Sequence, residues 1–301
     1  MLSNLNSELI NEFDRALFIL NTKINPNNPQ IEDINIVENI ISNSKVLQKF
    51  KQHLLEQLYD GEGYFYCDLN SITKAVDEAK LINFLILCCV GQPIWLFKDA
   101  PLWFELQVKP EVDPIRTHGT GKNPLHTDLL VFEYLPDVIS FHCIRKDPQG
   151  GGDTLLCDMT KILNFLSVEE IDLLSLNIYK YWKDEGIDVL GNSMSSFSII
   201  KDRIIRYTSK MKKHLYAHSA DVLTHEGLSY VEKLIALFEK LDLLIDNNME
   251  EIKLEAGHLM LFNQLRFTHG RGELGSNQQD ISKVERRLIS QSYVHRKAVF
   301  L

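Results

Sequence analysis

The feature that most constrains this chain is a histidine and an aspartate two positions apart, His126 and Asp128, followed far along the sequence by a second histidine, His269. On a β-strand, residues i and i+2 point to the same face, so one strand can present an imidazole and a carboxylate side by side. His269 can join them only if the fold places two distant strands next to each other. The pattern therefore predicts a sheet-based fold that assembles one site from two distant segments.

Two imidazoles and one carboxylate on one face of a metal ion, with the other positions open, are typical of non-haem Fe(II) oxygenases. The His-x-Asp pair alone is a weak signal, because a chain with ten histidines and many aspartates will contain such pairs by chance. A surface histidine beside a turn-forming aspartate is the simpler interpretation of that pair. The rest of the sequence has to separate the two interpretations.

The overall charge bears on the class of partner. The chain has 301 residues, 32 of them basic and 41 acidic, with a formal net charge of −9 and no prominent basic run. Such a chain is not expected to bind nucleic acid or an anionic membrane surface, and a small-molecule substrate fits better. The length allows one large domain or two small ones. We favour one, because the two halves of the predicted site lie far apart in sequence. A homo-oligomer remains open.

The cysteines and the N-terminus indicate a cytoplasmic protein. There are five cysteines, and their spacings form neither a zinc site nor a disulfide framework, so we expect buried thiols in a reducing compartment. The first residues lack the basic segment and apolar core of a signal peptide. The most apolar stretch, Leu81–Val90, is far shorter than the ~20 residues that a membrane span needs.

Hydrophobic periodicity divides the chain into a helical first part and a strand-rich second part. Apolar residues at helical spacing predict helices over about 7–21, 36–59 and 71–88, the last with Ser71 as its N-cap. A capping box at Ser167 and Glu170 predicts a short helix, and a longer helix is expected over about 224–244. Strands are expected at 64–67, 104–108, 125–132, 138–144, 154–157, 178–182, 196–200, 204–207, 251–254, 258–263 and 288–294.

Helices followed by many short strands, with one helical insertion, predict an α+β fold. A double-sheet jelly roll, or double-stranded β-helix, suits this number of strands and leaves few open edges. Its mouth is a natural place for a ligand pocket. We expect one domain over residues 1–301, with a helical N-terminal part over about 1–90 and the jelly-roll core over about 91–301.

Four ordered segments form a more specific pattern. They are Asn123–Asp128 (Asn-Pro-Leu-His-Thr-Asp), Gly150–Leu155 (Gly-Gly-Gly-Asp-Thr-Leu), Glu255–Arg271, which ends in Phe-Thr-His-Gly-Arg, and Arg286–Leu288, which precedes an alternating strand. In order and separation they resemble the taurine dioxygenase and clavaminate synthase group of Fe(II)/2-oxoglutarate-dependent dioxygenases. The similarity spans about residues 60–296, and four ordered motifs are far less likely to arise by chance than one His-x-Asp pair.

The resemblance implies a metal site and a cosubstrate site. By matching position, His126, Asp128 and His269 would bind Fe(II), leaving positions for 2-oxoglutarate and O₂. Thr154 and Arg287 would bind the distal carboxylate of 2-oxoglutarate, for which a guanidinium offers a planar pair of donors. Arg286 is the neighbouring alternative to Arg287. The implied reaction couples oxidative decarboxylation of 2-oxoglutarate to hydroxylation, or a related oxidation, of a small polar, amino-acid-like metabolite.

The chain also departs from the pattern of this family. Relatives with anionic or amino-acid substrates carry a second arginine four residues after the cosubstrate arginine, whereas this chain has Gln291, which cannot form an ion pair, so the resemblance implies a different substrate or a different pose. Asn263 and Gln264 replace an Asp-Asn pair, which removes a carboxylate expected near the second histidine. Residues 272–283 are expected to form a flexible loop near the site. The candidate substrate contacts are Arg116, Leu129, Glu133 and Gln291.

Two other functions stay open at this level. A metal-dependent hydrolase could use a zinc-bound hydroxide at the same three ligands, but it would have no use for Arg287 or Thr154. A non-catalytic jelly-roll binding protein would be expected to have a damaged ligand set. His214 and His218 have the spacing of zinc ligands on a helix, but without the glutamate of the metalloprotease motif we interpret them as structural or solvated.

Overall fold

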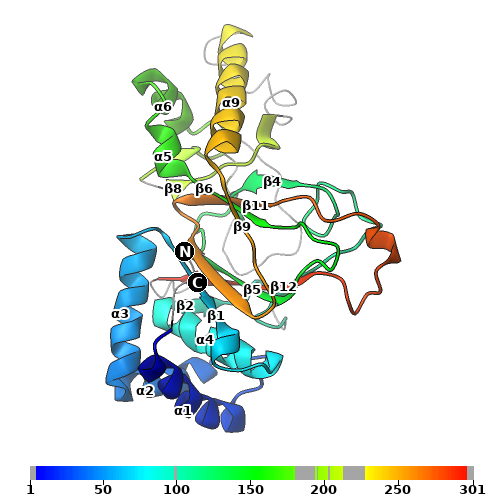
Figure 1. Cartoon of the computed structure of the whole chain (residues 1–301). Helices are drawn as coiled ribbons and strands as arrows, with labels where there is room; N and C mark the ends of the chain where they lie inside the picture. Colours follow the sequence, from blue (N-terminus) through cyan, green and yellow to red (C-terminus); the bar gives the residue numbers. More distant parts are fainter. Residues whose placement is uncertain are drawn as a thin grey trace.

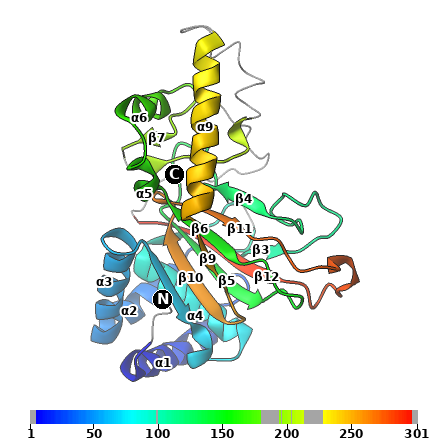
Figure 2. The same cartoon turned by 45° about the horizontal axis from the view of Figure 1, so that its top comes forward.

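The structure is a computed structural model that describes residues 5–97, 100–179, 194, 196–202, 204–212 and 228–296. It has an α+β fold in which two β-sheets lie between two groups of helices (Figures 1 and 2). In the described part of the chain, no helix is both long and apolar enough to cross a membrane. The helices are α1 (Ser7–Lys23), α2 (Asp33–Asn43), α3 (Lys45–Tyr59), α4 (Val76–Val90), α5 (Met159–Leu163), α6 (Val168–Ser175) and α9 (Leu228–Asn248).

The N-terminal part is helical, as the periodicity predicts, but two of the three predicted helices have different bounds. Helix α1 agrees with the predicted helix over 7–21. The single helix expected over 36–59 is wrong, because the chain breaks at Ser44, which is extended and caps α3 by accepting a hydrogen bond from the Leu47 amide. The helix expected from Ser71 begins instead at Val76, since residues 69–71 form a short 3₁₀ turn.

One sheet has six strands in the order β1 (Tyr64–Asp68), β10 (His258–Asn263), β5 (Val138–Arg145), β12 (Leu288–His295) and β2 (Gln92–Ile94), with β3 (Phe104–Gln107) also paired to β12. Both of its faces are covered. Val138, Leu261 and Val294 pack with the N-terminal helices, whereas Ile139 and Phe262 belong to the cluster on the opposite face. Strand residues alternate between faces, so consecutive apolar residues serve two separate cores.

The second sheet has four strands in the order β4 (Asn123–His126), β11 (Phe267–Arg271), β6 (Thr154–Asp158) and β9 (Glu250–Ile252). Strand β11 was not among the predicted strands. The strand predicted over 125–132 is also wrong, because β4 ends at His126 and the chain then turns, with Leu129 at a left-handed φ of 59°. Antiparallel pairing places His126 opposite His269, so the topology brings the two distant histidines together.

Between β6 and β9 the chain forms an insertion whose helices α5, α6 and α9 lie over the four-stranded sheet (Figures 1 and 2). The capping box of Ser167 and Glu170 is present at α6. The strands expected at 196–200 and 204–207 shorten to a hairpin of β7 (Ile200–Lys201) and β8 (Ile204–Ile205). Most of the predicted strand 178–182 and the start of the predicted helix 224–244, as well as His214 and His218, lie outside the described residues.

The segment 272–283, expected to form a flexible loop near the site, is hydrogen-bonded to the loops that contain Thr120 and Gly150. It contains a 3₁₀ turn, Gln278–Asp280, and the Gln278 side chain is buried. Gln278 donates hydrogen bonds to the buried Asp147 carboxylate at 2.9 and 3.0 Å. Leu274 forms a β-bridge with Gly151. A buried, paired carboxylate therefore ties this segment to the glycine-rich loop that precedes β6.

Candidate metal centre

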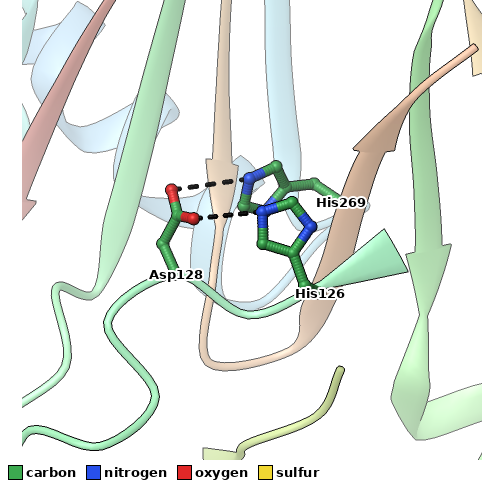
Figure 3. Close-up of side chains that lie close together, drawn as sticks. All are labelled: His126, Asp128 and His269. Carbon is green, nitrogen blue, oxygen red and sulfur yellow. Dashed lines mark ion pairs between the residues drawn. The ribbon is translucent and has the colours of Figure 1, made fainter. Parts of the chain in front are cut away.

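The two histidines and the aspartate of the predicted triad meet at one end of the four-stranded sheet. His126 is the last residue of β4, Asp128 lies in the turn that follows, and His269 is the central residue of β11. Because His126 and His269 are register partners on adjacent strands, their rings lie close, with centroids 4.5 Å apart. Figure 3 shows both rings turned toward the Asp128 carboxylate.

The three side chains present ligand atoms at a spacing that a metal ion can bridge. His126 Nε2 lies 3.2 Å from Asp128 Oδ1, and His269 Nε2 lies 3.5 Å from Asp128 Oδ2 (Figure 3). All three ligand atoms lie within 4.8 Å of one another, and among the described residues no other group of His, Cys, Asp or Glu does so. The prediction that Asp128 shares a strand with His126 is wrong, but the turn still delivers its carboxylate to the same point.

Local contacts orient the two imidazoles. The Nδ1 atom of His126 lies 2.8 Å from the Pro124 carbonyl oxygen, which can only accept, so Nδ1 carries a proton and Nε2, the ring nitrogen that faces Asp128, is the one left to bind a metal. His269 packs against the rings of Phe141 and Phe262, and its Nδ1 has no hydrogen-bond partner in the described part of the chain. Burial lowers the pKa of His269, which favours the neutral, metal-binding imidazole.

The turn that carries Asp128 is held from two sides. Gln264 accepts a hydrogen bond from the Asp128 amide at 2.9 Å, so this residue supports the aspartate rather than His269. On the other side, the buried Arg206 guanidinium donates to the carbonyl oxygens of Leu130, Phe132 and Glu133 at 2.6–3.0 Å. The backbone of Leu129 adopts a left-handed φ, which is unfavourable for a residue with a bulky side chain. These bonds hold the turn in that conformation.

The Asp128 carboxylate is ionised. Burial acts to raise its pKa, but in the metal-free protein the charge and hydrogen bonds of His269 and His126, when these are protonated, outweigh burial and hold the pKa well below the ordinary value. Oδ2 also accepts hydrogen bonds from Gln291 Nε2 at 2.8 Å and from the Tyr293 hydroxyl at 2.9 Å. The site therefore combines one anionic oxygen ligand with two imidazole ligands, a set that suits a divalent transition metal.

A cavity of about 840 Å³ opens at the triad and contains both predicted cosubstrate residues, Thr154 and Arg287. Arg287 is 8% exposed, and no hydrogen bond joins its guanidinium to another described residue. Arg286 does not line the cavity, and its Nε donates to the Ile281 carbonyl. Arg287 directly precedes β12 and lines the cavity with Gln291 and Tyr293 of that strand, since alternate residues along a strand share a face.

Three of the four predicted substrate contacts lie at the cavity, and one does not. Arg116, Leu129 and Gln291 line the cavity. Glu133 does not: its side chain is exposed, and its backbone carbonyl is bound by Arg206. Tyr293 was missed from the sequence, although its place two residues after Gln291 on an alternating strand is a signal that could have found it.

Arg271 was also missed as a residue of this region. It lines the cavity, and its guanidinium donates to the carbonyl oxygens of Gly272, Thr117 and Gly121. These contacts fasten the loop that carries Arg116 to strand β11. Its sequence signal was its place at the end of the His-Gly-Arg motif.

Comparisons with known proteins bear on this geometry. The family model described as taurine catabolism dioxygenase TauD, TfdA family matches residues 99–288, more than half of the chain. No curated protein matches the chain. The structure is similar to that of an asparagine oxygenase in complex with Fe(II), 2S,3S-3-hydroxyasparagine and succinate, with a TM-score of 0.75 and 14% identity over 97% of this chain and 93% of that one.

The structure is also similar to the non-heme iron oxygenase OrfP. The complex of OrfP with Fe and alpha-ketoglutaric acid gives a TM-score of 0.69 at 14% identity, over 97% of this chain and 92% of that one. The complex with Fe, succinate and (3S)-hydroxy-L-Arg gives 0.70 at 14% identity, over 97% and 93%. At these identities the likeness establishes the fold, which is the mixed helix and sheet fold of such oxygenases.

Proposed function

The chain belongs to the taurine catabolism dioxygenase TauD, TfdA family, and from this membership we propose that it hydroxylates a small polar, amino-acid-like metabolite with His126, Asp128 and His269 as its Fe(II) ligands. The enzyme is an Fe(II)/2-oxoglutarate-dependent dioxygenase. One observation carries the assignment of residues: the triad faces the same cavity as Arg287, which is buried without a hydrogen-bond partner among the described residues. A metal cation and a cosubstrate dianion would together satisfy both.

The donor set fits iron. Two neutral imidazoles and one carboxylate occupy one side of the site, and the cavity lies on the other side, where exchangeable ligands can enter. Fe(II) held by these residues would supply the redox chemistry that couples O₂ activation to the conversion of 2-oxoglutarate to succinate and CO₂. The task of the protein is to fix the ligands, hold the cosubstrate and keep the reacting groups within the cavity.

We assign the distal carboxylate of 2-oxoglutarate to Arg287, supported by Thr154. A guanidinium buried without a partner is costly, and a carboxylate that accepts two parallel N–H bonds would offset that cost. Burial lowers the pKa of Arg287, and a carboxylate bound to the guanidinium would favour its charged form. Thr154 begins β6 and lines the same cavity, where its hydroxyl can donate to the carboxylate.

The glycine-rich loop before β6 provides a test of this assignment. At Gly152, which has a φ of 70°, an added Cβ would lie 2.5 Å from a Leu274 side-chain carbon and 3.1 Å from Arg287 Cδ and Nε. We expect Gly152→Ala to displace Arg287, weakening 2-oxoglutarate binding and lowering the free energy of unfolding by about 1–3 kcal/mol. Anaerobic titration and chemical denaturation would measure these two quantities.

Gly150→Ala is the matched control for that variant. Gly150 also has a positive φ, of 83°, but an added Cβ there would meet no atom within 4 Å. It therefore reproduces the backbone strain without the contact to Arg287. Equal 2-oxoglutarate affinity in the two variants would contradict the assignment of Arg287.

We further propose that the two sheets form a double-stranded β-helix and that residues 1–301 make one catalytic domain. The β1 strand, from the helical part over about 1–90, pairs with β10 of the core over about 91–301, which supports a single unit. All five cysteines are free and buried, in keeping with the proposed cytoplasmic location.

The substrate proposal draws on the cavity and on the similar structures. The asparagine oxygenase and OrfP were solved with hydroxylated amino acids, which supports an amino-acid-like substrate for this chain. Arg116 and Leu129 lie on two different loops that line the cavity. We assign to them the role of substrate contacts, Arg116 for a polar or acidic group and Leu129 for an apolar part.

The proposed function can be tested without knowing the substrate. Fe(II) and 2-oxoglutarate added together without oxygen are expected to produce the weak visible metal-to-ligand charge-transfer band of chelated 2-oxoglutarate. A zinc-dependent hydrolase or a non-catalytic binding protein would give no such band. Its absence from folded, iron-loaded protein would therefore overturn the proposed function.

A further inference from the structure

Two residues on the same face of β12, Gln291 and Tyr293, donate hydrogen bonds to one oxygen of the predicted carboxylate ligand. Gln291 Nε2 lies 2.8 Å and the Tyr293 hydroxyl 2.9 Å from Asp128 Oδ2. Both side chains are almost fully buried, at 3% and 5% exposed. Asp128 lies beyond the end of β4 in the other sheet, so these bonds connect the two sheets across the cavity.

The geometry makes the two carboxylate oxygens unequal. Each oxygen lies near one histidine, Oδ1 at 3.2 Å from His126 Nε2 and Oδ2 at 3.5 Å from His269 Nε2, but only Oδ2 accepts the hydrogen bonds from Gln291 and Tyr293. A carboxylate on a turn can rotate about its Cβ–Cγ bond, and it can bind a metal through one oxygen or both. Two hydrogen bonds to one oxygen restrict that rotation and leave the other oxygen available to the metal.

We propose that Gln291 and Tyr293 are positioning residues that hold Asp128 with Oδ1 directed at the metal, and that Gln291 is not a substrate contact. The inference rests on the proposed iron site. It also accounts for the neutral side chain at this position: the amide donates to Asp128 without adding a charge that would compete with the metal for it. An anionic group of the substrate is therefore received elsewhere in the cavity.

The test measures metal binding rather than turnover. Co(II) is added to the metal-free full-length protein, and its visible absorption reports both affinity and ligand geometry. We expect Tyr293→Phe and Gln291→Met each to weaken Co(II) binding by roughly 10- to 100-fold and to change the absorption spectrum, because the carboxylate is no longer fixed. Gln291→Glu keeps the size of the side chain but places a second carboxylate against Oδ2, so it should weaken binding more than Gln291→Met.

Tyr66→Phe is the matched control. Tyr66 lies on β1 of the same sheet, and its hydroxyl bonds to the Lys253 carbonyl and to His258, away from the cavity. It should leave Co(II) affinity and spectrum unchanged. If Tyr293→Phe and both Gln291 variants also bind Co(II) as the wild type does, the proposal is wrong.

The anaerobic charge-transfer band separates this proposal from the proposed function. If the wild type shows the band with Fe(II) and 2-oxoglutarate, the proposed iron site is supported, and the variants then test only the roles of Gln291 and Tyr293. In that case the band should shift in the Tyr293 and Gln291 variants and stay in place in Tyr66→Phe. A wild type that binds Co(II) but gives no band would instead overturn the proposed function.

Discussion

Replacing Asp128 with alanine is expected to weaken Fe(II) binding by at least about 100-fold and to abolish consumption of 2-oxoglutarate. Loss of a residue that only supports a ligand costs roughly 10- to 100-fold in metal affinity, so loss of the ligand itself should cost more. Asp128 is the anionic member of the triad, and its removal leaves only the two imidazole side chains, which supply no negative charge, to hold a divalent cation. Anaerobic equilibrium dialysis with Fe(II) would measure the affinity.

Asp113→Ala controls for the loss of a carboxylate from the same cavity. Asp113 lines the cavity but does not belong to the triad, so this variant should bind Fe(II) as the wild type does. If Asp128→Ala retained wild-type Fe(II) affinity, the metal would have to bind elsewhere, and the interpretation of the triad would be wrong.

Replacing Arg287 with lysine is expected to raise the dissociation constant for 2-oxoglutarate by roughly 10- to 100-fold. Lysine keeps the charge but loses the planar pair of donors, and a hydrogen bond to a charged group contributes about 1.5–3 kcal/mol. The guanidinium is buried against the cavity, so water cannot easily replace the lost bond. Titration of 2-oxoglutarate into anaerobic, iron-loaded protein, followed by the charge-transfer band, gives the constant directly.

Arg286→Lys is the natural comparison, because it makes the same chemical change one residue away. Arg286 lies outside the cavity and bonds to the Ile281 carbonyl, so 2-oxoglutarate affinity should stay near that of the wild type. The reverse ranking of the two variants would show that the cosubstrate arginine has been assigned to the wrong residue. Unchanged Fe(II) affinity in Arg287→Lys would confirm that the effect is confined to the cosubstrate.

The triad could be proposed from sequence because its ligands belong to short motifs with fixed spacing. The geometry that joins them could not be proposed in detail. Strand β11 reads Phe-Thr-His-Gly-Arg, without the alternation of apolar and polar residues that identifies a half-buried strand. The predicted strand over 125–132 was too long because residues 129–132 are apolar. In the structure this segment is a turn, held by hydrogen bonds from Arg206. Local propensity does not reveal a contact with a distant arginine.

The helical part shows the same limit. Helix α1 followed from its apolar stripe, but the break at Ser44 was hidden because α2 and α3 continue a similar periodicity on either side of it. The roles of Gln291 and Tyr293 depend on distances of 2.8 and 2.9 Å to a residue in another sheet. Sequence position placed Gln291 near the cavity, but only the packing of the two sheets decides which atom its amide reaches.

Arg206 has a consequence for how the enzyme can be altered. It follows β8 in the insertion between β6 and β9, and its three hydrogen bonds end on the backbone of the segment just after Asp128. Thr127 is joined to the same region through the backbone of Ile205 and Tyr207. The insertion is thus bonded to the turn that carries Asp128, the proposed iron ligand. Exchanging or shortening the insertion to accept a new substrate is expected to displace Asp128 unless the hydrogen bonds of Arg206 are kept.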